Sequence, residues 1–501
     1  MDYKKLQNGS DIRGVALEGI EGQHVNLTEE VCRNIGRGFA LWLRACLAKD
    51  CLRVSVGRDS RLSGEMLAGW LCDAMGQQGI EVTDIGMAST PAMFMSTVTG
   101  NAPYDAAVMI TASHLPFNRN GFKFFTKDGG LEKQDIAQIL AYAAGEDITG
   151  LPPVAVKNGE FMDDYASILV EKVRSATGET TPLDGFKIVV DAGNGAGGFY
   201  ADRVLKPLGA DTDGSQFLDP DGSFPNHIPN PEDDAAMEAI KAAVSKRNAD
   251  FGIIFDTDVD RAGAVLSDGT ELNRNRIIAM LAAVLLREHP GTTIVTDSIT
   301  STGLAAFVEQ RGGIHHRFKR GYKNVINESI RLNALGQDSQ LAIETSGHGA
   351  MKENYFLDDG AYLVTKLLIE LARGKREGYT LESLIADLAE PAESKEFRLN
   401  IIPEDFKAYG EDVLDRLNFY AAKQDGWTIA PNNHEGMRVN LDADHGNGWF
   451  LLRMSLHDPL MPLNIESDEV GGVLKIAREL SPFLSTCDGL DTEKLNAFVE
   501  A

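Results

Sequence analysis

Three short runs of apolar and β-branched residues recur along the chain, each followed by a turn with glycine, serine or asparagine and then by a helix-like stretch. The runs are residues 52–57, 187–191 and 293–297. Short strands that alternate with helices predict α/β units on parallel or mixed sheets. The runs begin roughly 105 to 135 residues apart, which is the spacing of repeated domains and not of a solenoid.

The chain is long enough for three or four domains, since its 501 residues exceed the size at which a single core stops growing. The last segment has a different pattern of predicted elements, with a strand-like stretch at residues 449–455 and a closing helix from Val470. We expect three similar α/β domains with mixed sheets and a C-terminal α+β domain, arranged around a central cleft. The proline pair near residue 152, a turn at 267–270 and an acidic linker at 389–394 place the boundaries at 1–153, 154–268, 269–390 and 391–501.

The net charge of -26 and the pI near 4.8 argue against nucleic acid and membrane partners, because such a field repels phosphates. The longest apolar stretch, residues 277–286, is too short to span a bilayer and predicts a buried helix. Five cysteines without a C-x-x-C pair predict a reducing compartment without disulfides or a zinc site. No apolar signal core opens the chain, so we expect a cytoplasmic protein, or a plastid stromal one if a targeting peptide has been removed. We expect a monomer or weak dimer.

Three aspartates at alternate positions, Asp256, Asp258 and Asp260, follow an apolar run. Side chains alternate across a strand, so all three should point to one side. Clustered carboxylates need a neutralising cation, and Mg²⁺ prefers hard oxygen ligands. A calcium EF-hand would need glycine and glutamate where this chain has Arg261 and Ser267. The trio predicts a Mg²⁺ site, with a solvated acidic turn as the alternative, and Arg261 is suited to hold a phosphate oxygen.

A serine, Ser113, directly follows another apolar run and enters a loop that Pro116 and Gly121 should keep irregular. Its side chain should therefore be presented and not packed. A hydroxyl needs a base or a charged neighbour to act as a nucleophile. His114 and Lys123 are the nearest candidates. From these residues alone, a helix-capping serine beside a surface histidine is the alternative.

A literal G-x-G-x-x-G string at residues 193–198 follows a strand-like run, with an acidic residue about twenty positions on. It keeps a nicotinamide-dependent oxidoreductase open as an alternative. Against it, the remaining sequence offers no hydride chemistry, and this function would leave the aspartates unexplained.

Two polar loops complete the candidate set. Glu344, Ser346 and His348 end an apolar run and together can bridge vicinal hydroxyls of a pyranose. Residues 317–323 are basic within an acidic chain, and so supply the local positive charge that a phosphosugar requires. Taken singly, a polar turn and a solvated basic face are the alternatives.

Together these strings resemble the active-site motifs of the α-D-phosphohexomutase superfamily, which includes phosphomannomutase and phosphoglucomutase. Residues 111–123 are similar to its serine loop, 256–261 to its metal loop, 344–348 to its sugar loop and 11–14 to its N-terminal Asp-Ile-Arg-Gly element. The resemblance extends from about residue 9 to residue 467. It implies an enzyme that interconverts the 1- and 6-phosphates of mannose and/or glucose through a phosphoserine and a 1,6-bisphosphate. In this family the glycine string is a structural turn.

The resemblance also implies a role for each matched residue. The catalytic group would be Ser113, His114, Lys123 and Arg13. The Mg²⁺ ligands would be Ser113, Asp256, Asp258 and Asp260. Substrate would be bound by Arg261, Gly321, Tyr322, Lys323, Glu344, Ser346 and His348, and its phosphate by Arg453, Ser455 and His457. In chain order, the four domains would supply the phosphoserine, the metal, the sugar site and the phosphate site.

The chain departs from the family motif in its last domain. Family members usually have Arg-x-Ser-Gly-Thr-Glu-Pro, whereas Leu456 and His457 here replace the glycine and threonine. Leucine restricts the approach of backbone amides to a phosphate, although Arg438 could assist. The changed loop resembles that of a divergent branch found in plants and algae, and Tyr322 stands where some members have histidine. The altered loop keeps a catalytically silent phosphosugar-binding protein open as an alternative. A phosphoglucosamine mutase also stays open, because the motifs do not settle which hexose is used.

Overall fold

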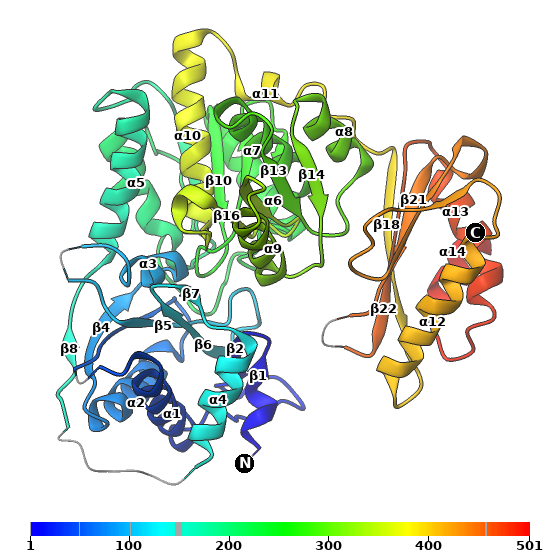
Figure 1. Cartoon of the computed structure of the whole chain (residues 1–501). Helices are drawn as coiled ribbons and strands as arrows, with labels where there is room; N and C mark the ends of the chain where they lie inside the picture. The colour runs from blue at the N-terminus through cyan, green and yellow to red at the C-terminus, as the bar shows by residue number, and fades with distance from the viewer. Residues whose placement is uncertain (1, 50, 101, 146–152, 456–457, 501) are drawn as a thin grey trace. The chain divides into compact units, whose positions relative to one another are not determined.

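The computed structural model describes residues 2–49, 51–100, 102–145, 153–455 and 458–500. The chain forms two compact units. The first comprises Met1–Leu281 and Ser346–Leu384, and the second comprises Ala282–Thr345 and Ile385–Ala501. The long helix α7 (Arg274–Glu288) runs across the division, and each unit is described by itself (Figure 1).

The first unit begins with an eight-stranded mixed sheet in the order β1-β2-β6-β5-β3-β4-β8, with β7 paired to β6. Its strands are β1 (Gln7–Asn8), β2 (Asp11–Val15), β3 (Arg53–Arg58), β4 (Glu81–Met87), β5 (Ala106–Ile110), β6 (Arg119–Thr126), β7 (Gly129–Gly130) and β8 (Lys157–Asn158). Strand β3 is parallel to β4 and β5, and β4 is parallel to β8, whereas β6 is antiparallel to β2, β5 and β7. Every residue of β5 is buried, as expected for a central strand covered on both faces.

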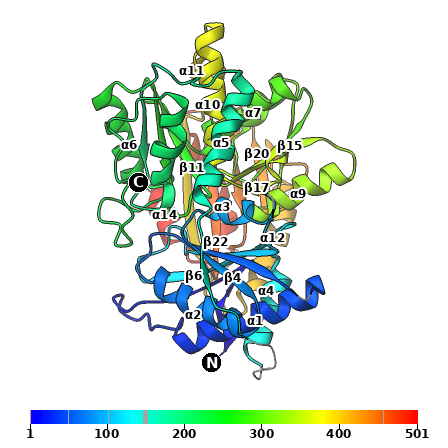
Figure 2. The ribbon, with the colours of Figure 1, turned by 90° about the vertical axis from the view of Figure 1, so that its left-hand side faces the viewer.

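Four helices cover this sheet: α1 (Glu29–Leu47), α2 (Gly64–Gln77), α3 (Thr90–Met95) and α4 (Lys133–Ala143). Helices α1, α2 and α4 lie together on one face, and α3 lies on the other (Figures 1 and 2). Thr28 begins α1 by accepting a hydrogen bond from the N–H of Val31, and two glutamates in the first turn suit the positive end of the helix dipole. The buried side chains of Phe39, Val54 and Phe124 belong to the core between helices and sheet.

A second, four-stranded sheet in the same unit has the order β12-β11-β10-β9. Its strands are β9 (Ile188–Asp191), β10 (Phe251–Phe255), β11 (Ala262–Leu266) and β12 (Glu271–Leu272), with β9 parallel to β10 and the other pairs antiparallel. Helix α6 (Asp234–Arg247) packs on β10, while α5 (Met162–Thr177) and α10 (Gly360–Glu377) lie side by side (Figure 2). The short pair β16 (Gly349–Met351) and β17 (Leu357–Asp358) precedes α10, and α11 (Leu381–Leu384) follows it.

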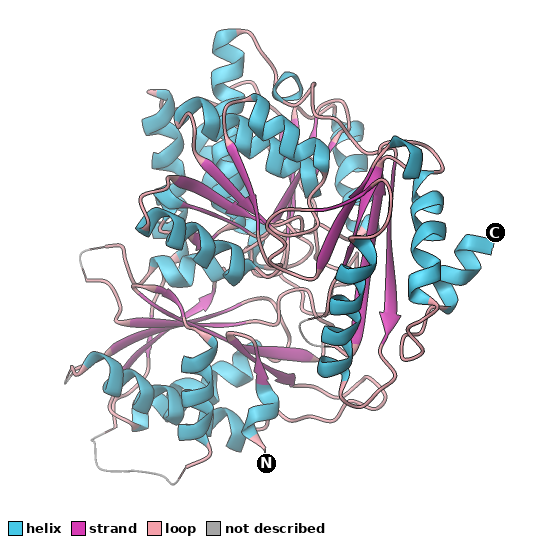
Figure 3. Ribbon diagram, turned by 45° about the vertical axis from the view of Figure 1, so that its right-hand side comes forward, coloured by secondary structure: helices cyan, strands magenta, loops and turns pink. Residues whose placement is uncertain are grey.

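The second unit contains the parallel strands β14 (Ile314–Arg317), β13 (Thr293–Thr296) and β15 (Ser339–Ile343), with β13 in the middle. Helices α8 (Thr302–Gln310) and α9 (Tyr322–Ala334) connect them. The C-terminal part is a five-stranded antiparallel sheet in the order β18-β22-β21-β20-β19. Its elements are β18 (Glu393–Asn400), α12 (Phe406–Ala421), β19 (Trp427–Ile429), β20 (Met437–Leu441), β21 (Gly448–Leu452), β22 (Leu460–Ser467), α13 (Gly472–Leu484) and α14 (Glu493–Glu500) (Figure 3).

The predicted strands at residues 52–57, 187–191 and 293–297 are confirmed as β3, β9 and β13, and the predicted α+β texture of the last segment is confirmed. The predicted buried helix at residues 277–286 is part of α7. Two details are wrong: Gly121 lies inside strand β6 and not in an irregular loop, and the predicted linker ends early because β18 begins at Glu393. No helix in the described part of the chain is both long and apolar enough to cross a bilayer.

Candidate functional site

The loop after β5 holds Ser113 in an unusual backbone conformation. Its φ is +51°, in the left-handed region, which costs a non-glycine residue roughly 1–2 kcal/mol. The loop is held from within, because the N–H of Ser113 donates to Thr111 Oγ1 at 2.8 Å. Arg61, which the sequence analysis assigned no role, is buried and donates to the main-chain carbonyls of Ser113 and Leu115, the latter at 2.6 Å. Strain compensated by such contacts is typical of functional loops.

Ser113 is buried, at 8% exposure, so the prediction that its side chain is presented and not packed is wrong. The reason is that a second loop closes over it. Its hydroxyl donates to Asp256 Oδ2 at 3.1 Å and accepts from Arg261 Nη2 at 3.0 Å. The same Nη2 lies 2.8 Å from His114 Nδ1. Serine, carboxylate, guanidinium and imidazole therefore meet at one point.

Because arginine can only donate, the Nδ1 of His114 accepts its hydrogen bond and the ring is neutral. Although part of His114 is exposed, enclosure of the ring by protein, together with the positive charge of Arg261, lowers its pKa to about 3. The hydrogen of the neutral ring therefore lies on Nε2, and His114 can take up a proton only when Arg261 leaves Nδ1.

The three aspartates converge as predicted, but by a different route. Strand β10 ends at Phe255, and Asp256, Asp258 and Asp260 lie in the turn between β10 and β11, so strand alternation does not align them. Val259 instead reverses the chain with a φ of +68°, which is rare for a β-branched residue.

All three aspartates are buried, and their carboxylate oxygens lie within 4.8 Å of one another. In the described part of the chain, Asp258 Oδ1 and Asp260 Oδ1 are buried without a hydrogen-bond partner. Three hard oxygen ligands, two with free lone pairs, fit a divalent cation.

Lys123, on β6, supplies the counter-charge of this cluster. Its Nζ donates to Asp258 Oδ2 at 2.9 Å and to Asp260 Oδ2. Burial lowers the pKa of Lys123, but the two aspartates outweigh burial and raise it well above its usual value. Lys123 is therefore a fixed ammonium and not a base.

His348 extends the cluster on the side of β16 and β17. Its Nδ1 lies 2.6 Å from Asp358 Oδ2 and 3.9 Å from Asp260 Oδ1. Burial lowers the pKa of His348, but Asp358 and Asp260 outweigh it and raise the pKa to about 9. Sequence analysis gave Asp358 no role, whereas its carboxylate sets the charge of His348. Ser346 lies nearby in sequence, and its Oγ is buried without a hydrogen-bond partner among the described residues.

Arg13 supports the serine loop from β2. Its guanidinium donates to the Thr111 carbonyl at 2.7 Å and to Asp11 at 2.8 Å. Thr111 Oγ1 also accepts from the Ser113 N–H, so Thr111 links Arg13 to the serine. The role predicted for Arg13 at the serine stays a prediction.

The G-x-G-x-x-G string packs against the aspartate turn. A Cβ on Gly195 would lie 2.7 Å from the Thr257 carbonyl oxygen and 2.8 Å from its Cα. The next N–H, of Ala196, donates to that carbonyl at 2.8 Å. A Cβ on Gly198 would lie 2.2 Å from the Leu218 carbonyl oxygen. These glycines therefore serve close backbone packing, as the resemblance implied.

In the second unit, the predicted basic loop and Glu344 come together. Gly321 has a φ of +112°, and its N–H donates to Glu344 Oε1 at 2.5 Å. Tyr322 and Lys323 follow immediately as the first two residues of α9. Glu344 follows the end of β15, so the carboxyl end of a parallel strand carries this polar group, as in other α/β sites.

The predicted phosphate-binding residues Arg453 and Ser455 follow β21 in the second unit. Arg453 is buried, and its Nη1 lies 3.6 Å from Glu435 Oε1. Ser455 Oγ accepts from the Asp458 N–H at 3.3 Å. His457 and Leu456 lie outside the described residues. Glu435, which was not a predicted site residue, also accepts from Ser298 Oγ at 2.6 Å and from the Arg320 N–H at 3.1 Å.

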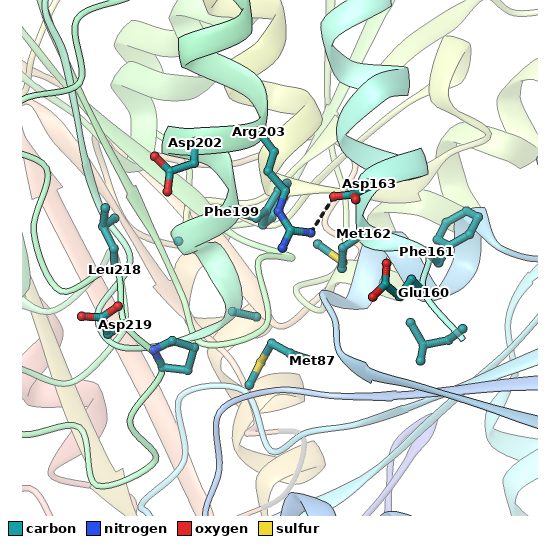
Figure 4. Close-up of a pocket in the computed structure, with 14 residues that line it drawn as sticks. Met87, Glu160, Phe161, Met162, Asp163, Phe199, Asp202, Arg203, Leu218 and Asp219 are labelled. Atoms are coloured by element: carbon teal, nitrogen blue, oxygen red, sulfur yellow. Dashed lines mark hydrogen bonds and ion pairs between the residues drawn. The ribbon is translucent and has the colours of Figure 1, made fainter. Parts of the chain in front are cut away.

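A large cavity of about 630 Å³ lies elsewhere in the first unit (Figure 4). Four carboxylates line it, and only Arg203 among its lining residues is basic, paired to Asp163 at 2.8 Å. None of the predicted site residues lines it. Its negative character is unsuited to a phosphosugar.

Family models match three successive parts of the chain. They are described as phosphoglucomutase/phosphomannomutase alpha/beta/alpha domain I at residues 4–148, domain II at 163–269 and domain III at 273–391. The chain belongs to the phosphoglucomutase/phosphomannomutase family. The members of this family are enzymes, and the resemblance read from the motifs is confirmed.

Curated relatives align along most of the chain. A phosphomannomutase/phosphoglucomutase of Pseudomonas putida is 31% identical over 464 residues, covering 92% of each chain. A phosphoglucomutase of Neisseria meningitidis is 30% identical and covers 94% of this chain and 95% of its own. A phosphoglucosamine mutase of Geotalea daltonii is 31% identical over 76% of this chain and 82% of its own.

Solved structures agree with the fold. A phosphoglucomutase/phosphomannomutase family protein from Burkholderia thailandensis is 29% identical, with a TM-score of 0.75 over 96% of this chain and 97% of its own. The phosphoglucomutase parafusin from Paramecium has a TM-score of 0.73 over 99% of this chain and 95% of its own, at 16% identity, which shows the fold alone.

Proposed function

We propose that this enzyme is a Mg²⁺-dependent phosphohexomutase that interconverts the 1- and 6-phosphates of mannose and/or glucose through a phosphorylated Ser113. The observation that carries the proposal is the convergence of Asp256 and Arg261 on the Ser113 hydroxyl. Phosphoryl transfer needs a nucleophile or carrier oxygen, a cation site and a guanidinium in one place, and mainly requires positioning and charge stabilisation.

Each group in this arrangement has a chemical task. The free hydroxyl of a bound hexose phosphate attacks the phosphorus on Ser113, the bond from phosphorus to Ser113 Oγ breaks, and a hexose 1,6-bisphosphate forms. Arg261 holds the phosphoryl oxygens, and its planar fork suits them. Lys123 stabilises charge on the serine side as a fixed ammonium. The proton of the attacking hydroxyl passes to Nδ1 of neutral His114 once Arg261 has turned from that nitrogen to the phosphoryl oxygens. After the intermediate reorients, its other phosphate returns to Ser113.

The metal would be held by Asp256, Asp258 and Asp260, with an oxygen of the group on Ser113 as a fourth ligand. When bound, Mg²⁺ supplies positive charge that offsets the clustered carboxylates and the phosphoryl oxygens. Glu344, Ser346 and His348 would recognise sugar hydroxyls, as the resemblance to the family implies. Arg453 and Ser455 would hold the phosphate that does not react.

Two measurements test the proposal. Intact-mass measurement should show one added phosphate of about 80 Da that a Ser113→Ala variant lacks. A coupled assay on glucose 1-phosphate and mannose 1-phosphate, with glucose 1,6-bisphosphate and Mg²⁺, should show turnover that Ser113→Ala abolishes. Binding of these sugars without any turnover would instead establish a silent phosphosugar-binding protein, and turnover of glucosamine phosphate alone would establish the phosphoglucosamine enzyme.

A further inference from the structure

Asp258 is held in place by a residue from a distant part of the first unit. Thr90 is the first residue of α3 and lies 168 positions from Asp258 in the chain. Its Oγ1 donates to Asp258 Oδ2 at 2.5 Å, and its N–H donates to the Asp258 carbonyl at 2.8 Å. Both residues are buried. One threonine therefore positions the side chain and the main chain of Asp258.

The two carboxylate oxygens of Asp258 differ in their hydrogen bonds. Oδ2 accepts from Thr90 and also from Lys123 Nζ, the latter at 2.9 Å. Oδ1 is buried and has no hydrogen-bond partner among the described residues. A carboxylate oxygen offers about two lone-pair sites, so the two donors occupy those of Oδ2. Only Oδ1 is left to bind a cation.

The other two aspartates of the turn resemble Asp258 in this respect. Asp260 Oδ2 accepts from Lys123, whereas its Oδ1 has no hydrogen-bond partner in the described part of the chain. Asp256 Oδ2 accepts from Ser113 and from Arg261. Single carboxylate oxygens suit Mg²⁺, which requires octahedral geometry, whereas Ca²⁺ takes about six to eight oxygens and often binds a carboxylate through both.

Thr90 is better suited than Lys123 to fix the orientation of Asp258. Lys123 has a long, flexible stem, and its Nζ is shared with a second carboxylate. Thr90 is β-branched, so its χ1 angle is restricted, and Pro91 fixes the backbone of the next residue. The Thr90 hydroxyl is therefore presented to Asp258 from a rigid helix start.

We propose that Thr90 is a positioning residue that makes Asp258 bind the metal through Oδ1 alone, and so makes the site select Mg²⁺ over Ca²⁺. Without the hydroxyl, Lys123 is the one remaining donor to Oδ2. The carboxylate can then turn and offer both oxygens, a geometry that suits Ca²⁺ and not Mg²⁺. This inference rests on the proposed function, because it requires that Asp256, Asp258 and Asp260 hold the metal.

The test is the affinity of the full chain for Mg²⁺ and, separately, for Ca²⁺, obtained from the rise in the thermal unfolding midpoint over a concentration series of each ion. Thr90→Val removes the hydroxyl and keeps the shape of the side chain. It should weaken Mg²⁺ binding about 10- to 100-fold, as is typical of losing a hydrogen bond to a metal ligand, and Ca²⁺ binding less than about threefold. The ratio of the two affinities should therefore fall. Thr90→Ser keeps the hydroxyl and should restore this ratio.

Thr97→Val is the matched control. Thr97 is also buried, lies in the turn after α3 and donates from Oγ1 to the Phe94 carbonyl at 2.8 Å. Its replacement should lower the midpoint without ions as Thr90→Val does, because each variant loses one buried hydrogen bond, but both ion affinities should stay unchanged. Intact mass should show the same group on Ser113 in all proteins compared. Thr90→Ala takes the place of Thr90→Val if the latter does not fold.

The outcomes separate this inference from the proposed function. If Thr90→Val keeps the affinity ratio of the unaltered protein while Asp258→Asn loses Mg²⁺ binding, the positioning role of Thr90 is overturned and the metal site stands. If Mg²⁺ does not stabilise the unaltered protein, or stabilises Asp258→Asn equally, the aspartates do not hold the metal, and both the inference and the proposed metal site are wrong.

Discussion

The guanidinium of Arg261 donates to the hydroxyl of Ser113 across 3.0 Å, although the two residues are 148 positions apart in the chain. Through Asp256 and His114, the same guanidinium links the loop after β5 to the turn after β10. Its other nitrogen, Nη1, is fixed by Asn230 Oδ1 at 3.0 Å. A guanidinium fixed in this way is already oriented toward a group on the serine before any substrate arrives.

Replacement of Arg261 by lysine should lower kcat/KM about 100- to 1000-fold, which is typical of losing one preorganised donor at a developing charge. Lysine keeps the positive charge but cannot donate to Ser113, His114 and Asn230 at once. The coupled mutase assay provides the measurement. Arg203→Lys, at a surface ion pair with Asp163, is the matched control and should behave as the unaltered enzyme. If Arg261→Lys kept kcat/KM within twofold, the role proposed for the Arg261 guanidinium would be wrong.

Removal of divalent cations with a chelator should abolish turnover, and Mg²⁺ should restore it. Because the three buried carboxylates repel one another, Mg²⁺ should also raise the thermal unfolding midpoint as a ligand of the folded state does. Asp258→Asn should remove most of this rise. Asp202→Asn, at an exposed residue paired with Lys206, should retain it. An equal rise in the Asp258→Asn protein would place the stabilising Mg²⁺ elsewhere.

Gly195→Ala should destabilise the protein by roughly 1–3 kcal/mol, the usual cost of inserting a methyl group where nothing can give way. The added Cβ would meet the backbone of Thr257, which lies between two of the aspartates, so the response to Mg²⁺ should weaken as well. Urea unfolding with and without Mg²⁺ measures both effects. Gly69→Ala is the control, because its Cβ would enter open space within helix α2 and should be neutral or slightly stabilising.

Local patterns in the sequence were sufficient for the strands that carry the site. The apolar runs before Ser113 and Asp256 are β5 and β10, and the turn after each strand is where the reactive groups lie. Sequence could not show how the aspartates converge, because a left-handed valine is not encoded by any residue preference. It also could not show the burial of Ser113, which depends on a contact with Arg261 from another sheet.

The sequence patterns also did not reveal the residues that hold the site residues in place. Arg61 is an ordinary arginine in the sequence, and only its four hydrogen bonds to the carbonyls of the serine loop reveal its role. Glu435 and Asp358 are similar cases, since each acts by setting the charge or orientation of a predicted residue. Such roles depend on long-range pairing that periodicity and motif spacing do not report.

Glu435→Gln should lower the KM for hexose phosphate by about three- to tenfold while kcat stays within twofold. The carboxylate lies 3.6 Å from Arg453, so a phosphate bound to that arginine would meet a like charge nearby. Removal of a like charge a few ångströms away in solvent corresponds to roughly 1 kcal/mol. Glutamine keeps an oxygen that can accept from Ser298 and Arg320. Initial rates over a substrate series give both constants, and Glu411→Gln on the exposed face of α12 is the control. A rise in KM would instead mean that Glu435 positions Arg453 for the phosphate.

His227 gives the enzyme a pH-dependent element of stability. Its Nε2 lies 3.0 and 3.1 Å from the two carboxylate oxygens of Asp191, and its Nδ1 lies 2.9 Å from the carbonyl of Ile228. Both ring nitrogens face acceptors, so the ring is satisfied only as the imidazolium. Burial lowers the pKa of His227, but the hydrogen bond and charge of Asp191 outweigh burial, with a smaller contribution from Asp233, and the net shift is upward.

A group whose pKa is raised on folding stabilises the folded state fully below its unfolded pKa, near 6.5, and loses that contribution as pH rises through the folded pKa. The thermal unfolding midpoint of the enzyme should therefore exceed that of His227→Gln most at pH 6, and the gap should narrow toward pH 9. His24→Gln is the control, because His24 is exposed and its ring has no carboxylate partner among the described residues. The unfolding midpoint of His24→Gln should stay close to that of the enzyme at every pH. If the difference in unfolding midpoint between the enzyme and His227→Gln stayed constant or widened with rising pH, the folded protein would instead contain the neutral ring of His227.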